Sequence, residues 1–350
     1  MKYLFYISKF YSITIIKPLM EYLDTTQDEY AILVSRKVKK KITEKNIWSD
    51  KTIITTIREG IEFNPDFCLS PGNYVDFRLP GIKVEIFHGI GIEKPSHYEI
   101  RHFFDVYLTS GPVVTEKFEA LRKKYGYFLV RETGWAKMDY IMKYPSENIR
   151  GKYEFPAYKK IILYAPTFSK KMQSADALTE IIPSIIKDDE IWLIKFHEFM
   201  DKSVIQNIKE LNDTRIVLLG THDITPYLYI ADVMISDTSS VIYEFMALDK
   251  PVITFKTMAR KDKGIDISSA GELRLTLDRI LVNPEEHSEI RKKHMDEVNP
   301  YLDGNISSNI FKTLEKIKEN NELPKKKKPL NIFRKLRILY HEKFRNGHLK

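Results

Sequence analysis

The chain has 350 residues, of which 43% are hydrophobic and 30% are charged. A chain of this length is longer than a single domain with one hydrophobic core usually is, so it predicts two domains. The composition excludes a disordered chain. The single cysteine, Cys68, excludes an internal disulfide, and no apolar run reaches the length of a membrane-spanning helix. We therefore expect a globular, cytoplasmic protein.

The first half of the chain alternates short apolar runs, which predict strands, with amphipathic runs, which predict helices. The predicted strands are KYLFYIS, YAILVS, KTIIT, FCLS, KVEIFHG, VYLTS and YFLVRET. A second series begins near residue 160 with KIILYAPT, EIWLIKFHE, RIVLLG, DVMISD and PVITF. Continuous apolar strands that alternate with helices indicate parallel sheets covered on both faces. We expect an α/β protein with two Rossmann-like domains facing a cleft, at residues 1–150 and 151–320, and a tail at 321–350.

The positive charge is concentrated in that tail. The whole chain has a net charge of +8, but residues 325–350 contain seven lysines, three arginines and one acid, so the rest sums to about −1. On a helix, Phe333, Leu336, Tyr340 and Phe344 would form an apolar stripe beside basic residues. This pattern is typical of a segment that lies on an anionic membrane surface, although a disordered basic end is the alternative. Nucleic acid is not an expected partner, because the near-neutral body lacks a basic face.

Polar residues at strand ends are the candidates for a functional site, because open α/β sheets bind ligands beyond the carboxyl ends of their strands. In the first domain, His88 and Gly89 follow an apolar strand, and a glycine lets the backbone approach a ligand closely. In the second, Thr167 ends one strand and Lys195 and His197 end the next. Lys195 and His197 alternate on one face of their strand, which suits a phosphate or pairing with neighbouring carboxylates.

The segment DTSS, Asp237 to Ser240, connects an apolar strand directly to a helical run. One of these residues, Asp237 or Ser239, would serve as the N-cap of the helix. Four polar side chains in a row exceed what capping needs, and hydroxyls at a helix N-terminus favour an anion, most often a phosphate. Both interpretations remain open on this segment alone.

Several common site motifs are missing from the sequence. It contains neither a Walker loop nor a G-x-G-x-x-G segment, which argues against a nucleotide triphosphatase and a dehydrogenase. The ligand spacings typical of structural metal sites are also absent. We therefore expect neither a metal nor a separate cofactor.

Five segments together resemble one known family. They are HG at residues 88–89, YAPTF at 164–168, KFH at 195–197, GWAKMDY at 134–140 and ADVMISDTSSVIYEFMALDKPVITF at 231–255. In their order along the chain, over about residues 80 to 300, they are similar to the CDP-glycerol glycerophosphotransferases, which prime and polymerise teichoic acids and related capsule polymers. The resemblance implies a GT-B fold.

The resemblance also implies a reaction and roles for the residues. A polyol phosphate, of glycerol or ribitol, would move from a CDP-activated donor to a hydroxyl of a lipid-linked or polysaccharide acceptor, with release of CMP. His88 would be the general base, and His197 the second catalytic histidine, in contact with phosphate together with Lys195. The remaining donor-binding residues would be Thr167, Asp237, Ser239 and Ser240. Such an enzyme would work peripherally on the inner face of the plasma membrane.

The chain departs from the family pattern at three places. Thr238 replaces a tyrosine, Glu198 replaces a proline, and Phe168-Ser169-Lys170 replaces an aromatic residue followed by arginine. The changes at Glu198 and Lys170 fall where the resemblance places the donor phosphates. They leave open a glycosyltransferase or epimerase that uses a UDP- or CMP-sugar. A further alternative is a non-catalytic subunit of a polymer-assembly complex.

Overall fold

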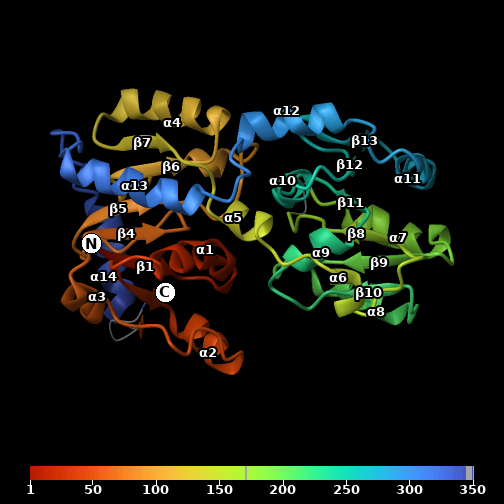
Figure 1. Cartoon of the computed structure of the whole chain (residues 1–350), viewed down its shortest axis with the longest axis horizontal. Helices are drawn as coiled ribbons and strands as arrows, with labels where there is room; N and C mark the ends of the chain where they lie inside the picture. Colours follow the sequence, from red (N-terminus) through yellow and green to blue (C-terminus); the bar gives the residue numbers. More distant parts are fainter. Residues whose placement is uncertain (170–171, 344–348, 350) are drawn as a thin grey trace. The chain divides into compact units, whose positions relative to one another are not determined.

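The computed structural model describes residues 1–169, 172–343 and 349, and the chain divides into two compact units. The first unit comprises residues 1–90, 95–142 and 298–350. The second comprises residues 91–94 and 143–297. Each unit is built around one parallel β-sheet, as expected from the two series of apolar runs (Figure 1).

The sheet of the first unit has seven parallel strands, counted over the described residues, in the order β3-β2-β1-β4-β5-β6-β7. This is the Rossmann order with one further strand at the edge. The strands are β1 (Lys2–Ile7), β2 (Glu29–Val34), β3 (Ile53–Ile54), β4 (Phe67–Ser70), β5 (Ile82–Glu85), β6 (Val106–Thr109) and β7 (Leu129–Glu132). The helices are α1 (Ile13–Leu23), α2 (Arg36–Glu44), α3 (Ile57–Phe63), α4 (Pro112–Tyr125), α5 (Lys137–Met142), α13 (Ile306–Glu319) and α14 (Ile332–Lys343).

The sheet of the second unit has six parallel strands within the described part of the chain, in the order β10-β9-β8-β11-β12-β13. It too has the Rossmann order. The strands are β8 (Lys160–Tyr164), β9 (Glu190–Ile194), β10 (Ile216–Leu218), β11 (Val233–Ser236), β12 (Val252–Phe255) and β13 (Ile265–Ile267). The helices are α6 (Ile149–Lys152), α7 (Ala175–Ile185), α8 (Lys202–Glu210), α9 (Thr225–Ile230), α10 (Val241–Met246), α11 (Leu273–Val282) and α12 (Ser288–Val298).

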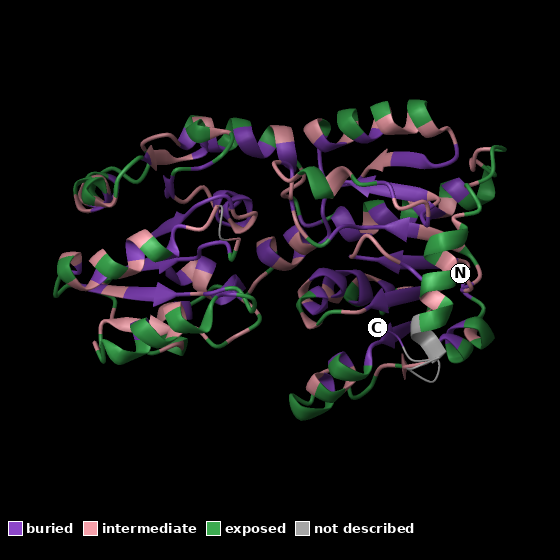
Figure 2. Cartoon of the chain, turned by 180° about the vertical axis from the view of Figure 1, so that it is seen from behind, coloured by how far each residue is buried: buried purple, intermediate pink, exposed green. Residues whose placement is uncertain are grey.

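Burial of the central strands explains their continuous apolar sequences. All residues of β4, β6, β11 and β12 are buried, as are five of the six residues of β1 (Figure 2). Helices on both faces exclude water from such strands, so no residue needs to be polar for the sake of an exposed face. The polar groups accumulate instead where the strands end.

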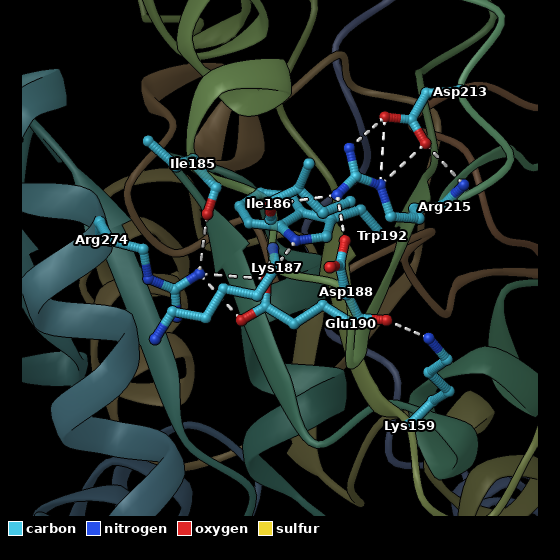
Figure 3. Close-up of polar contacts among 10 residues, drawn as sticks. All are labelled: Lys159, Ile185, Ile186, Lys187, Asp188, Glu190, Trp192, Asp213, Arg215 and Arg274. Atoms are coloured by element: carbon cyan, nitrogen blue, oxygen red, sulfur yellow. Dashed lines mark hydrogen bonds and ion pairs between the residues drawn. The ribbon is translucent and has the colours of Figure 1, made fainter.

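The second unit keeps a polar network at the edge where β9 begins, opposite the edge where ligands bind in such sheets (Figure 3). The carboxylate of buried Glu190 pairs with Arg274 at 2.8 Å and accepts a hydrogen bond from Trp192 Nε1 at 3.0 Å. Beside it, Arg215 pairs with Asp213 at 2.7 Å. Each of these carboxylates pairs with an arginine, which is how a fold keeps buried and half-buried charges without large cost.

The boundaries of the units differ from the expected ones in the C-terminal part. Residues 298–320, expected in the second domain, pack in the first unit. There the buried Asp139 carboxylate accepts hydrogen bonds from the backbone N–H groups of Ile306 and Ser307, at 3.0 and 2.7 Å, and so caps α13. Gly134 has φ of +90°, and a Cβ on it would lie 2.8 Å from the Ile306 side chain. The segment GWAKMDY therefore attaches the returning chain to the first unit.

Glu85, the last residue of β5, has a carboxyl group in the interior of the first unit. Its side chain is buried, and its Oε2 atom has no hydrogen-bond partner among the described residues. Burial raises the pKa of this carboxyl well above its usual range, with Arg101 opposing the shift. The folded protein therefore holds this proton more tightly than the unfolded chain, and the side chain costs stability as pH rises above the ordinary glutamate value of about 4.3.

We expect Glu85→Gln to be more stable than the natural protein at pH 8, because the amide has the same shape and carries no charge. The gain should shrink towards pH 4, where both side chains are neutral in both states. Thermal unfolding at several pH values measures this, since ~1 kcal/mol shifts the midpoint of a domain of this size by about 2–4 °C. A difference that stays constant with pH would contradict the assignment.

Candidate functional site

Asp237, directly after β11, holds the loop that follows β8. Its carboxylate is fully buried and accepts hydrogen bonds from the N–H groups of Thr167 and Ser174, both at 2.9 Å, and from Ser174 Oγ at 3.0 Å. Burial raises the pKa of Asp237, and these hydrogen bonds oppose the rise. Asp237 does not cap α10: the N-cap residue is Ser240, and its side chain makes no capping hydrogen bond. The capping interpretation of the DTSS segment is therefore wrong for both Asp237 and Ser239.

The four residues of the DTSS segment divide into two pairs. Thr238 is buried like Asp237, and its Oγ1 accepts a hydrogen bond from Met258 N at 3.4 Å. Ser239 and Ser240 are only half-buried. Their hydroxyls make no hydrogen bond within the part of the chain that the structure describes. The first pair therefore belongs to the interior, and the second pair presents two hydroxyls that a ligand can bind.

Lys195 and His197 follow β9, whose carboxyl end lies at the same edge of the sheet as that of β11. Lys195 is half-buried, and its Nζ donates to the neighbouring Phe196 carbonyl at 2.9 Å. Partial burial lowers the pKa of this ammonium, and Glu198 opposes the shift. Among the described residues this ammonium is bonded to one neighbouring carbonyl and has lost part of its hydration, which makes it a favourable place for an anion.

The imidazole of His197 is exposed and lies among aromatic rings. Its centroid is 4.3 Å from that of Phe168 and 5.3 Å from that of Phe199. Nδ1 accepts a hydrogen bond from Phe199 N at 3.2 Å, which leaves Nε2 as the donor in the neutral ring. The rings packed against it remove part of its hydration, which is the main cause that lowers the pKa of His197; Glu198 opposes the shift, and Lys195 and Lys94 add to it. Near neutral pH the ring therefore presents an N–H group.

Thr167 is buried at the end of β8, and its backbone N–H is bound by Asp237. Its expected contact with the donor is thus restricted to the side chain. Lys170, which replaces the arginine of the family pattern, lies outside the described residues.

His88 and Gly89 lie beyond the end of β5, in the first unit. The backbone turns sharply before them: Phe87 has φ of +55°, an unfavourable conformation for a bulky residue, and its carbonyl accepts a hydrogen bond from Trp135 Nε1 at 3.1 Å. The His88 side chain is exposed, with its ring 5.8 Å from that of Tyr11. Trp135, from the segment GWAKMDY, thus helps to hold the loop that carries His88, a role that only the fold reveals.

Lys250, which follows α10 within the segment at residues 231–255, has a structural role. Its Nζ donates to the carbonyls of Leu228, Tyr229 and Ala231, at 2.9, 2.5 and 2.8 Å, at the end of α9. Burial lowers the pKa of this ammonium to about 8. Three carbonyl acceptors replace its hydration and leave no donor for a ligand.

Two kinds of substitution should separate the residues of the DTSS segment. Asp237→Asn places an amide NH₂ among three donors, so we expect a loss of about 2 kcal/mol or more in the free energy of unfolding. Ser239→Ala and Ser240→Ala should each change it by less than ~0.5 kcal/mol, because their hydroxyls make no contact that the fold uses. Urea unfolding of the three variants measures this; equal losses in all three would refute the division.

Comparison with known proteins follows the same segments. The family model of CDP-glycerol:poly(glycerophosphate) glycerophosphotransferases matches residues 99–316. A teichoic acid glycerol-phosphate primase of Bacillus subtilis (strain 168) is 31% identical over 172 residues, 45% of this chain and 44% of that protein. A primase of the same description from Bacillus spizizenii is 33% identical over 115 residues, 31% of this chain and 29% of that protein. The chain thus spans less than half the length of these curated relatives.

Solved structures with the same fold have more distant sequences. The wall teichoic acid polymerase TagF is 18% identical with a TM-score of 0.63, over 92% of this chain and 90% of that chain. A UDP-GlcNAc 2-epimerase from Neisseria meningitidis is 15% identical with a TM-score of 0.59, over 90% of this chain and 100% of that chain. These likenesses establish the fold alone. Because the family model matches more than half of the residues, the chain belongs to the CDP-glycerol:poly(glycerophosphate) glycerophosphotransferase family.

Proposed function

We propose that this protein transfers a polyol phosphate, of glycerol or ribitol, from a CDP-activated donor to a hydroxyl of a lipid-linked or polysaccharide acceptor, and releases CMP. The observation that carries the proposal is the family match over residues 99–316. This range contains the sheet edge with the unsatisfied hydrogen-bond donors of Ser239, Ser240, Lys195 and His197. Hydroxyls, an ammonium and an imidazole N–H are the groups that bind a diphosphate.

The chemistry assigns a task to each group. The acceptor oxygen attacks the distal phosphorus of the donor, the bond from that phosphorus to the bridging oxygen breaks, and CMP leaves with the electron pair. The acceptor's proton passes to a base, for which we propose His88, because an imidazole has its pKa near the working pH. Lys195, His197 and the two serines would hold the diphosphate and stabilise the charge on the departing CMP. Asp237 would act only by positioning the loop after β8.

Two other functions remain as outcomes of the test. A UDP- or CMP-sugar enzyme is compatible with the fold, since UDP-GlcNAc 2-epimerases share it. A non-catalytic subunit of a polymer-assembly complex would need no base. The family match favours the phosphotransferase over both.

Thermal unfolding with CDP, UDP, GDP and CMP tests the donor. We expect CDP to give the largest shift, since a ligand at about 100 times its Kd stabilises by about 2.7 kcal/mol. The double variant Ser239→Ala with Ser240→Ala should lose most of this shift while it keeps the unliganded midpoint. His88→Ala should keep the shift but lose transfer from a CDP-polyol by at least about 100-fold. Preference for UDP would favour the sugar enzyme, and full function of His88→Ala in cells would favour the non-catalytic role.

We also propose that α14 attaches the protein to an anionic membrane surface. The segment is fixed to the first unit: Lys328 pairs with Asp105 at 2.7 Å, and Arg334 with Glu99 at 3.3 Å. Its apolar side chains nevertheless face solvent, with Phe333 90% and Leu336 57% exposed. The other exposed apolar residues here are Leu330, Ile332, Leu339 and Tyr340. Phe344, the last residue of the expected stripe, lies outside the described residues.

Charge complementarity favours an anionic lipid surface as the occupant of this helix face. Residues 325–343 contain eight basic residues and one acid, so anionic headgroups fit where a neutral protein partner would not. No helix in the described part of the chain has both the length and the apolar content needed to cross a bilayer.

Sedimentation with vesicles tests this attachment. Phe333→Ser with Leu336→Ser should weaken binding to phosphatidylglycerol vesicles by about tenfold or more, because each apolar side chain contributes about 1.5–3 kcal/mol on burial. The matched control, Leu275→Ser with Val282→Ser, removes two side chains that are 78% and 77% exposed on α11 and should have no effect. Binding should also weaken as salt rises. Equal binding to phosphatidylcholine vesicles would contradict the proposal.

A further inference from the structure

Residues 91–94 are held in the second unit by a buried ion pair, although the chain on either side belongs to the first unit. Glu93 Oε1 lies 2.8 Å from Lys263 Nζ and accepts a hydrogen bond from the hydroxyl of Tyr243 at 2.9 Å. The side chain of Lys263 is 0% exposed and that of Glu93 is 8% exposed. Separating such a pair leaves uncompensated charge in the interior, so the position of this short segment is strongly specified.

The next residue, Lys94, is half-buried, and the hydrogen-bond donors of its ammonium are unsatisfied. Within the described part of the chain its ammonium makes neither a hydrogen bond nor an ion pair. Burial lowers its pKa, opposed first by the charge of Asp237 and then by that of Glu93. No hydrogen bond or ion pair joins Lys94 to Asp237 among the described residues; the carboxylate of Asp237 accepts from Thr167 and Ser174 instead. Lys94 is near enough to His197 to lower the pKa of that imidazole as well.

Other buried lysines of the second unit differ from Lys94. Lys250 donates to three carbonyls, and Lys263 pairs with Glu93. Their lost hydration is replaced within the protein. Lys195 and Lys94 differ from them: among the described residues the two have one hydrogen-bond partner between them, the carbonyl of Phe196. The hydrogen bond between Glu93 and Tyr243, in the first turn of α10, places Lys94 near the start of this helix, where Ser239 and Ser240 lie.

We propose that Lys94 is a further donor-binding residue, whose ammonium contacts the diphosphate together with Lys195 and His197, and that Glu93 is the residue that positions it. This inference rests on the proposed function. A diphosphate supplies the missing counter-ion, and an ammonium with three donors suits its several oxygens. Lys94 thereby joins the site from a segment only six residues after His88.

The test measures Kd for CDP by calorimetry with three variants. Lys94→Met keeps the length of the side chain without its charge, and we expect it to bind CDP about 10- to 100-fold more weakly. Lys94→Arg keeps the charge and should stay within a few-fold of the natural protein. Lys187→Met is the matched control: Lys187 belongs to the same unit, lies before β9 in the network of Figure 3, and is 50% exposed in a surface ion pair with Asp278. It should leave Kd unchanged.

Two results would overturn the inference. One is a Kd for Lys94→Met within threefold of the natural value. The other is equal weakening in Lys94→Met and Lys94→Arg, since the effect would then come from shape rather than charge. The weakening in Lys94→Met should also come with a smaller dependence of Kd on salt and an unliganded midpoint that does not fall. If the natural protein does not bind CDP at all, the proposed donor fails, whereas failure of Lys94→Met alone leaves the donor standing.

Discussion

The site of the second unit depends on one buried carboxylate. Asp237 lies at the end of β11 and binds the loop after β8 through Thr167 N, Ser174 N and Ser174 Oγ. These bonds join two neighbouring strands at the point where both lose their sheet partners. A carboxylate in this place satisfies several backbone donors at once, which a neutral side chain of similar size cannot do. Asp237 therefore holds Thr167 and Ser174, the two residues between which Phe168 lies in the chain. Phe168 in turn contacts the ring of His197.

The same arrangement recurs at the other characteristic segments of this chain. Asp139 caps α13 through two backbone N–H groups, and Lys250 binds three carbonyls at the end of α9. Trp135 Nε1 binds the carbonyl of Phe87, next to His88. In each case a charged or polar side chain replaces the missing partners of a helix or strand end. Residues that look chemically active in the sequence are thus used to hold the loops on which the exposed groups sit.

The sequence predicts the two sheets well because each buried parallel strand needs a continuous apolar run, and such runs are visible without a structure. It does not predict that residues 298–320 return to the first unit, because the cause is a tertiary contact of Asp139 with α13. The division within the DTSS segment is equally hidden. Asp237 and Ser239 are both polar residues before a helix, and only burial distinguishes the one that binds backbone from the one that presents a free hydroxyl.

The charged residues at this edge lower the stability of the free protein, and a bound ligand offsets that loss. An ammonium loses free energy when water is removed and nothing replaces it, and the second unit avoids this loss at Lys250 and Lys263 but not at Lys94 and Lys195. Pairing the latter with carboxylates would stabilise the free protein, yet it would also fill the positions that an anion must occupy. The ammonium groups of Lys94 and Lys195, whose hydrogen-bonding capacity is not satisfied within the protein, therefore lower the stability of the free protein and favour the binding of an anion. Because a ligand that binds the folded state restores the lost interactions, the stability of this unit and the occupancy of its anion site are coupled by mass action.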